Sequence, residues 1–363
     1  MFDVLIEKFN VNKKTIFIAL DTASVFIYLF IMAYSFSRPL RVWVNLLTGN
    51  SIIVITIYFS LFYALYFIFA LPLKYYQGLS YVREHGFYDW LRTVFKKEVI
   101  VFFIMFFVIQ FIYFFLETEV LWWWLPVSFL CIVSRYAWEF APKYLASFLF
   151  RLKALAPSEF KQRLIELAVR GNIEVTDVFS FANAKFEVAF LGQGPGRKLI
   201  LNEKIMDYAP EEIEILVARE AAEHYYRHMR YKLILEALVI LLSFFMVNLA
   251  FKPTADYFGF EFTFNIETLP VLIGLFFIAF MLMSLIRNHY SRFMDKQVDI
   301  YALKATQAPA AFISLLFRQK EAENKYEQDY FLNQILNGRI SETERITFAQ
   351  DYAQGMLLKE KGK

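Results

Sequence analysis

The stretch that decides the fold is Leu-Val-Ala-Arg-Glu-Ala-Ala-Glu-His-Tyr-Tyr-Arg-His, residues 216–228. It lies inside a predicted helix that begins at Ala209-Pro210-Glu211-Glu212, because proline and acidic residues are favoured in the first turn of a helix. Residues four apart share one face of a helix, so we expect Arg219 and Glu223 to lie together. The helix is expected to continue into an apolar segment that begins at residue 233.

The composition predicts a polytopic membrane protein. Of the 363 residues, 58% are hydrophobic and 20% are aromatic, which exceeds what a soluble protein of this size carries. The formal net charge of +3 is too small to indicate a nucleic-acid partner. Six stretches reach the roughly 20 residues that cross a bilayer. They are 15–36, 51–73, 97–117, 119–141, 233–252 and 267–287.

The loops between these stretches predict an orientation. Basic residues gather at the N-terminus and in the loop 74–96, whereas the loop 253–267 is mostly acidic. The positive-inside rule therefore places both termini in the cytoplasm. The predicted organisation is a four-helix transmembrane region (1–141) with the cytoplasmic loop 74–96, a cytoplasmic insert (142–232), two transmembrane helices (233–287) and cytoplasmic C-terminal helices (288–363).

Asp21, Gln110 and Glu236 are polar residues that lie inside the predicted spans. Such groups normally face protein or water instead of lipid. We expect them to make internal packing contacts, and the alternative is a functional role.

The insert has an α+β pattern. Ser158 is placed to cap a helix that ends at Gly171. Strand-like runs follow at Glu174–Phe181, Lys185–Leu191 and Lys198–Leu201. The glycine-rich turn at 192–196 predicts a hairpin, because a phosphate-binding loop would need a helix directly after it.

From about residue 58 to residue 346 the chain resembles the integral-membrane CAAX prenyl proteases, which are zinc metalloendopeptidases. The resemblance begins at Pro72, Tyr75-Tyr76 and Gly86-Phe87, which match the exit of the family's second span and the loop after it. It continues in the segments Phe160–Gly171, Phe190–Leu201, Pro210–Glu214, Arg219–His228 and Met294–Ala302. Arg345 follows Ile340-Ser341, where the family has His-Pro with a downstream arginine. The resemblance implies a mainly α membrane protein of the bacterial inner membrane with a zincin-like α+β insert and a small β-hairpin or sheet.

The zinc-site residues of the family are largely replaced. In the pattern His-Glu-x-x-His, Arg219 takes the place of the first histidine, Glu220 is kept, and Glu223 takes the place of the second histidine. Asp295 stands where the family has its last ligand, a glutamate, while Asp299 matches. The resemblance thus implies a degenerate site with no intact catalytic set.

Arginine has only donors and stays protonated in proteins, so Arg219 cannot bind zinc. We expect no zinc and no other cofactor. We expect Arg219 instead to form ion pairs with Glu223 and Asp295, which would join the two helices that a metal would otherwise join.

Two metal alternatives remain open. His224 and His228 are four apart and form a possible relocated metal site. A set drawn from Glu220, Glu223, His224, His228 and Asp295 would make the chain an active membrane metalloendopeptidase with nonstandard ligands.

The leading interpretation is a catalytically inactive homologue that acts by binding, as a scaffold or accessory subunit of a membrane complex. Val188, Ala189 and Phe190 correspond to the family strand that holds a peptide by strand addition. The partners expected are membrane lipid and either other membrane protein subunits or a peptide segment, and no nucleic acid.

Overall fold

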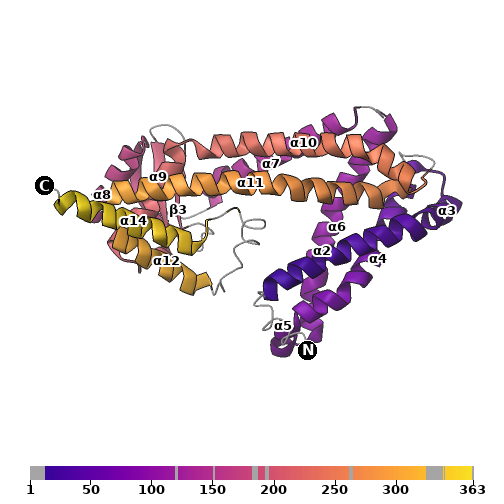
Figure 1. Ribbon diagram of the computed structural model, residues 1–363, viewed down its shortest axis with the longest axis horizontal. Coiled ribbons are helices and arrows are strands. Elements are labelled where there is room, and N and C mark those ends of the chain that lie inside the picture. Colours follow the sequence, from indigo (N-terminus) through magenta and orange to yellow (C-terminus); the bar gives the residue numbers. More distant parts are fainter. Residues whose placement is uncertain are drawn as a thin grey trace. The chain divides into compact units, whose positions relative to one another are not determined.

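The computed structural model describes residues 13–118, 122–149, 152–181, 187–192, 196–260, 265–323, 338 and 340–361. The fold divides into two compact units. Unit 1 comprises Met1–Ile132 with Val239–Met283, and unit 2 comprises Val133–Leu238 with Ser284–Lys363. Figure 1 colours the elements along the chain, and the helices α7, α10 and α11 contribute to both units.

Unit 1 is built from helices, several of them long and apolar. They are α2 (Lys13–Ile31), the π-helix η1 (Met32–Phe36), α3 (Ser37–Leu47), α4 (Ser51–Gln77), α5 (Leu79–His85), α6 (Phe87–Thr118), the first part of α7 (Trp124–Leu149), the end of α10 (His228–Tyr257), the 3-10 helix η4 (Ile266–Thr268) and the start of α11 (Leu269–Thr306). A helix satisfies its own backbone hydrogen bonds, so this is the structure that an apolar chain adopts in lipid.

Five helical segments among the described residues are long and apolar enough to cross a membrane. They are Phe17–Leu47, Ser51–Gln77, Phe87–Thr118, His228–Tyr257 and Ile266–Thr306. The fourth predicted span, 119–141, corresponds in its described part to a shorter apolar helix, Trp124–Ala137. The prediction of a mainly α polytopic membrane protein is confirmed, with five such helices where the sequence suggested six.

Polar side chains in unit 1 contact protein. Asp21 accepts from the amide of Gln77 at 2.9 and 3.0 Å, and Gln110 donates to the hydroxyl of Thr56 at 2.9 Å. The internal contact expected for Gln110 is thus confirmed, whereas Asp21 contacts protein from an exposed position.

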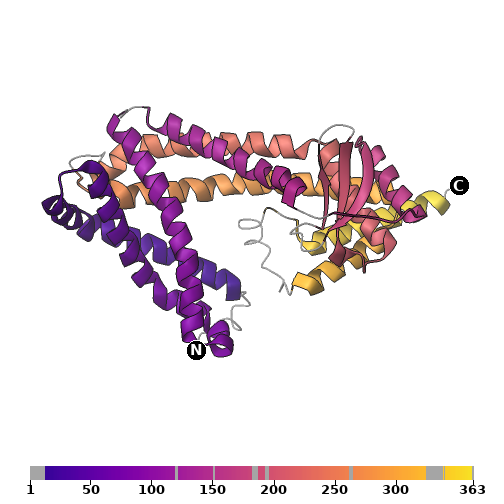
Figure 2. The ribbon, with the colours of Figure 1, turned by 180° about the vertical axis from the view of Figure 1, so that it is seen from behind.

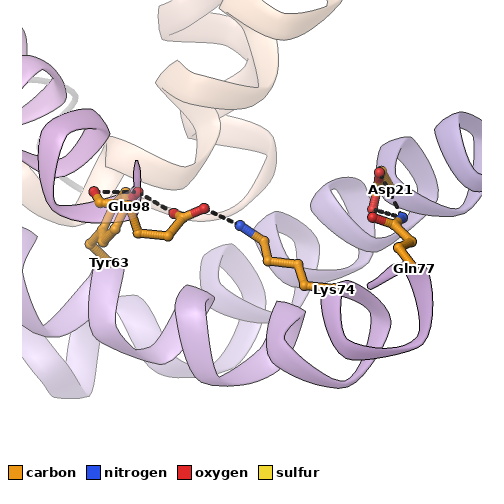
Figure 3. A network of polar contacts seen from close by, with 5 residues as sticks. All are labelled: Asp21, Tyr63, Lys74, Gln77 and Glu98. Atoms are coloured by element: carbon orange, nitrogen blue, oxygen red, sulfur yellow. Dashed lines mark hydrogen bonds and ion pairs between the residues drawn. The ribbon is translucent and has the colours of Figure 1, made fainter. Parts of the chain in front are cut away.

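Glu98 is the centre of a second set of polar contacts in unit 1. Figure 3 shows this residue of α6 between Tyr63 and Lys74 of α4. The Tyr63 hydroxyl donates to Glu98 Oε2 at 2.7 Å, and Lys74 forms an ion pair with Glu98 Oε1. These contacts fasten α6 to α4.

Unit 2 contains a four-stranded sheet, whose strands are drawn as arrows in Figure 2. Its strands are β1 (Lys153–Ala154), β2 (Val175–Phe181), β3 (Val188–Leu191) and β4 (Arg197–Asn202), in the order β1-β2-β4-β3. β3 and β4 pair antiparallel, which confirms the predicted hairpin, although residues 193–195 of its turn lie outside the described residues. β2 and β4 pair in parallel.

The helices of unit 2 pack on this sheet and on each other. Besides parts of α7, α10 and α11, they are α8 (Glu159–Arg170), the 3-10 helix η3 (Glu203–Ile205), α9 (Pro210–Tyr225), α12 (Pro309–Glu323) and α14 (Glu342–Lys361). Ser158 caps α8 by accepting from the Lys161 amide, as predicted. The core includes Leu164, Leu199, Val217, Ala218, Leu303 and Phe312, each at most 1% exposed.

The expected continuous helix from α9 into the fifth span is wrong. α9 ends at Tyr225, and α10 begins at His228. Arg227 between them has φ of 54°, a left-handed conformation that an α-helix cannot contain. The sequence carries neither glycine nor proline at this break, which is why pattern reasoning missed it.

Candidate functional site

The helix α9 is held deep in unit 2 by its apolar face. Ile215, Val217, Ala218 and Ala221 are completely buried. A Cβ atom at Gly171 would lie 2.8 Å from the Cβ of Ala221, so only glycine permits this close contact between the end of α8 and α9. The tight packing fixes the position of α9 and therefore of the polar residues on its other face.

The first turn of α9 is anchored by Glu212, which is 1% exposed. Its Oε2 accepts from the backbone amide of Ala209 at 3.1 Å, and its Oε1 accepts from the Ser314 hydroxyl at 2.7 Å. Arg318 Nε lies 3.4 Å from Oε2. A buried carboxylate with this many partners ties α9 to α12.

At the middle of α9, Arg219 takes part in a three-residue ion cluster. Its Nε lies 2.9 Å from Oδ1 of Asp299 on α11. Arg345 of α14 holds the same carboxylate in a forked contact, with Nε at 2.7 Å from Oδ2 and Nη2 at 3.1 Å from Oδ1. The Asp299 side chain is wholly buried. One carboxylate therefore joins α9, α11 and α14 through two guanidinium groups.

The ion-pair partners expected for Arg219 are wrong, although an ion pair between α9 and α11 does form. In the described part of the chain, its ion pair is with Asp299 and neither with Glu223 nor with Asp295. Glu223 is exposed to solvent instead. Asp299 lies four residues, about one helical turn, beyond Asp295 on α11, so the arginine reaches a carboxylate one turn further along the same helix.

Asp299 and Arg345 are the site residues whose role the sequence reasoning missed. Both match the resembled family, but the sequence pattern alone does not predict either as a partner of Arg219. Their charge could have indicated this role. Arg219 and Arg345 are basic, Asp295 and Asp299 are acidic, and four charged residues in motifs of one site predict a network of ion pairs and not a single pair.

Burial shifts the pKa of Asp295, which lies beside this cluster, and of Arg345, which belongs to it. Asp295 lies beyond the apolar run 267–287, on a helix about 60 Å long of which only about half can sit in a bilayer. Burial raises the pKa of Asp295 to about 6, while attraction to Arg219 opposes the rise. Burial also lowers the pKa of Arg345, and repulsion from Arg219 adds to that effect.

The residues of the alternative metal set do not converge. His224 Nε2 lies 3.9 Å from Glu220 Oε1, and its ring packs edge-on against Phe190. His228 is buried on α10, where its Nε2 lies 3.0 Å from Gln297 Oε1. The break at Arg227 separates the two histidines, which the sequence placed on one helical stripe.

These donors do not fit a zinc site. A guanidinium stands at the first ligand position, and it has no lone pair to offer a metal. Across the residues that the structure describes, no three histidine, cysteine, aspartate or glutamate side chains gather as metal ligands. No catalytic step through a metal is therefore derived for this chain.

The predicted peptide-binding strand is at one end of the sheet. β3 contains Val188, Ala189 and Phe190, and it pairs with β4 on one side only in the described sheet. Val188 and Phe190 are each 7% exposed and belong to the core, whereas Ala189 is half-buried. An edge strand offers unpaired backbone groups to an added strand.

Long apolar helices together with a small mixed sheet define a mainly α polytopic membrane protein, and the comparisons agree with this class. Residues 158–330 match the family model of peptidase family M48. The crystal structure of S. mikatae Ste24p aligns with a TM-score of 0.62 and 17% identity, over 83% of this chain and 77% of that chain. No curated protein matches the chain.

These findings confirm the resemblance drawn from the sequence. Residues 158–330 are similar to peptidase family M48, and the fold is similar to that of Ste24p.

Proposed function

We propose that this chain is a catalytically inactive member of its fold group that acts by binding, as a scaffold or accessory subunit of a membrane complex. The observation that carries the proposal is the ion cluster of Arg219, Asp299 and Arg345. Its ion pairs hold α9 and α11 together next to the position where the resembled proteases bind a metal. The contact between these helices therefore does not depend on zinc.

The binding function rests on β3. Its free edge suits an extended peptide segment of another membrane protein, held by backbone hydrogen bonds. The proposal places the protein in a bacterial inner membrane with both termini in the cytoplasm, as the loop charges indicate.

Metal content tests the loss of catalysis. Protein purified without chelators is expected to contain far less than one zinc per chain by elemental analysis. Stoichiometric zinc that disappears in Glu223→Ala would overturn the proposal and favour the active metalloendopeptidase. The triple variant Arg219→His, Glu223→His, Asp295→Glu is expected to gain zinc, because it restores two imidazoles and a carboxylate on the same helices.

Photo-crosslinking tests the binding role separately. A crosslinking amino acid at Ala189 in native membranes is expected to give one discrete adduct, which mass spectrometry then identifies. The matched control is the same amino acid at Glu166, an exposed position on α8. Identical adducts at both positions, or none at Ala189, would contradict peptide binding at the β3 edge.

A further inference from the structure

One exposed face of the helix α6 in unit 1 changes from basic to apolar along its length. Arg92 and Lys96 are four residues apart, so they share this face. Phe103 and Phe107 follow on it, because each lies eleven residues, about three helical turns, beyond one of the two basic residues. All four side chains are exposed, Phe103 at 53% and Phe107 at 67%. We call these four residues the α6 stripe.

The two basic residues of the α6 stripe have no anion paired with them. Within the part of the chain that the structure describes, neither side chain forms an ion pair, and the exposed acid one turn before Arg92, Asp89, does not form one with it. Glu98, two residues beyond Lys96, contacts α4 instead (Figure 3). The positive charge of the stripe is therefore available to an external anion.

Charges at the end of another apolar run behave differently. In unit 2, Arg135 Nε lies 2.8 Å from Oε2 of Glu236, whose side chain is 12% exposed. The internal contact expected for Glu236 from the sequence is thereby confirmed. Because that pair neutralises itself within the protein, the exposed cations of the α6 stripe need a different explanation.

The α6 stripe matches the depth of one membrane leaflet. Lys96 directly precedes the predicted span 97–117, so it belongs at the level of the lipid headgroups. Phe107 lies eleven residues further on, which is about 16 Å along a helix. Half of the hydrocarbon core of a bilayer is about 15 Å. The stripe therefore runs from the headgroup layer to about the middle of the bilayer.

The other end of α6 is acidic. Glu117 lies twenty-one residues beyond Lys96, about 32 Å along the helix, so the two residues mark opposite surfaces of the bilayer. Glu117 accepts a hydrogen bond from the Ser51 hydroxyl at 2.6 Å. A carboxylate at this end repels an anion, so α6 favours an anionic lipid in one leaflet only.

Aromatic packing holds the start of α6 in place. Trp90 is 4% exposed, and a Cβ atom at Gly78 would collide with its indole ring. Tyr75 and Phe87 pack against the same indole, with ring centroids 5.4 and 5.6 Å away. The basic residues that follow on α6 are thus presented from a fixed support, which lowers the entropy lost when a ligand binds.

We propose that the α6 stripe binds one anionic phospholipid. The phosphate contacts Arg92 and Lys96, because guanidinium and ammonium groups are the usual protein partners of phosphate oxygens. One acyl chain packs along Phe103 and Phe107. A zwitterionic lipid offers the same chains, but its own cation offsets the charge of its phosphate, so it binds less tightly.

A lipid titration tests the preference for an anion. Full-length protein in detergent is titrated with phosphatidylglycerol or with phosphatidylcholine, and bound lipid is counted by native mass spectrometry. One phosphatidylglycerol is expected to bind saturably and more tightly than phosphatidylcholine. Equal binding of the two lipids would overturn the proposal.

A charge-matched pair of variants separates the stripe from general surface charge. R92Q/K96Q is expected to weaken phosphatidylglycerol binding about tenfold to thirtyfold, since each cation contributes to the attraction of anionic lipid. R83Q/K97Q is the control, because it removes the same charge from exposed positions on α5 and on another side of α6. Its affinity should match that of the parent. Equal weakening by both pairs would contradict a defined site.

Two further measurements identify the occupant. A short-chain phosphatidylglycerol is expected to bind more weakly than the long-chain lipid, and equal affinity would contradict the acyl contact with Phe103 and Phe107. A crosslinking amino acid at Ile100, an exposed position between the basic and the apolar half of the stripe, is expected to capture lipid in native membranes. Capture of a polypeptide and no lipid would overturn the proposal.

Discussion

Two carboxylates, Asp299 in unit 2 and Glu98 in unit 1, fasten helices in different ways. Asp299 is wholly buried and is shared by two guanidinium groups from α9 and α14. Glu98 is 17% exposed and contacts one ammonium and one phenol, both from α4. The comparison teaches that the loss of stability on removing a buried charge depends on which charged partners remain unpaired. Loss of Asp299 leaves two partly buried cations without their shared anion, whereas loss of one Glu98 contact leaves the other intact.

The largest expected effect is that of Asp299→Asn. It leaves Arg219 and Arg345 without their anion in a buried setting, and removing one partner of a buried ion pair typically costs about 3–5 kcal/mol. Thermal unfolding in detergent, followed by circular dichroism, measures the loss. The control is Asp177→Asn, which removes a partly exposed pair with Lys161 and should cost less than about 1 kcal/mol. Similar losses for both variants would show that Asp299 does not organise unit 2.

The two arginines of the cluster are expected to differ. Arg345 makes two aligned hydrogen bonds and its side chain is 13% exposed, whereas Arg219 makes one contact and is 24% exposed. Arg345→Ala should therefore destabilise by about 3 kcal/mol and Arg219→Ala by about 1–2 kcal/mol. The same unfolding measurement gives the loss of stability for each variant. A larger loss for Arg219→Ala would contradict the expectation that Arg345 is the stronger partner of Asp299.

A double-mutant cycle checks that the residues act together. Arg345→Ala combined with Asp299→Ala is expected to cost less than the sum of the single changes, because the pair is removed as a unit. Strict additivity would mean that the two side chains stabilise unit 2 independently.

The sequence predicted the fold more fully than the site, for a physical reason. Apolar runs, the Ser158 cap and the glycines at 192–196 act locally, so the helix α8 and the hairpin β3–β4 followed from nearby residues. Which carboxylate Arg219 meets depends on the axial offset between α9 and α11, and a shift of one turn exchanges Asp295 for Asp299. The break at Arg227 likewise depends on packing, since its local sequence permits a helix.

The remaining carboxylate beside the cluster gives a pH-dependent prediction. The folded-state pKa of Asp295, about 6, lies above its ordinary 3.8, so the folded protein binds this proton more tightly than the unfolded chain. Protonated Asp295 therefore contributes fully to the free energy of unfolding below about pH 4. This contribution is lost as the pH rises through about 6, and the free energy of unfolding falls by up to about 3 kcal/mol.

Asp295→Asn, which cannot ionise, tests this directly. The variant should unfold at a higher temperature than the parent at about pH 8, and the difference should vanish near pH 4. Asp351→Asn, an exposed position on α14, is the control that should leave the profile unchanged. A variant less stable than the parent at high pH would mean that ionised Asp295 serves as a counter-ion to Arg219 and Arg345 and outweighs repulsion from Glu223 and Asp299.

The smallest effect belongs to unit 1. Tyr63→Phe removes the hydrogen bond of 2.7 Å to Glu98 but leaves the ion pair with Lys74, so no charge is orphaned. The expected loss is about 1 kcal/mol, the usual net value of one hydrogen bond. Tyr231→Phe, an exposed tyrosine on α10, is the matched control for the deleted hydroxyl and should change stability by less than about 0.5 kcal/mol. A loss of stability for Tyr63→Phe as large as that for Asp299→Asn would contradict the contrast between the two carboxylates. It would mean that a neutral partner of Glu98 stabilises the fold as much as the anion Asp299 does.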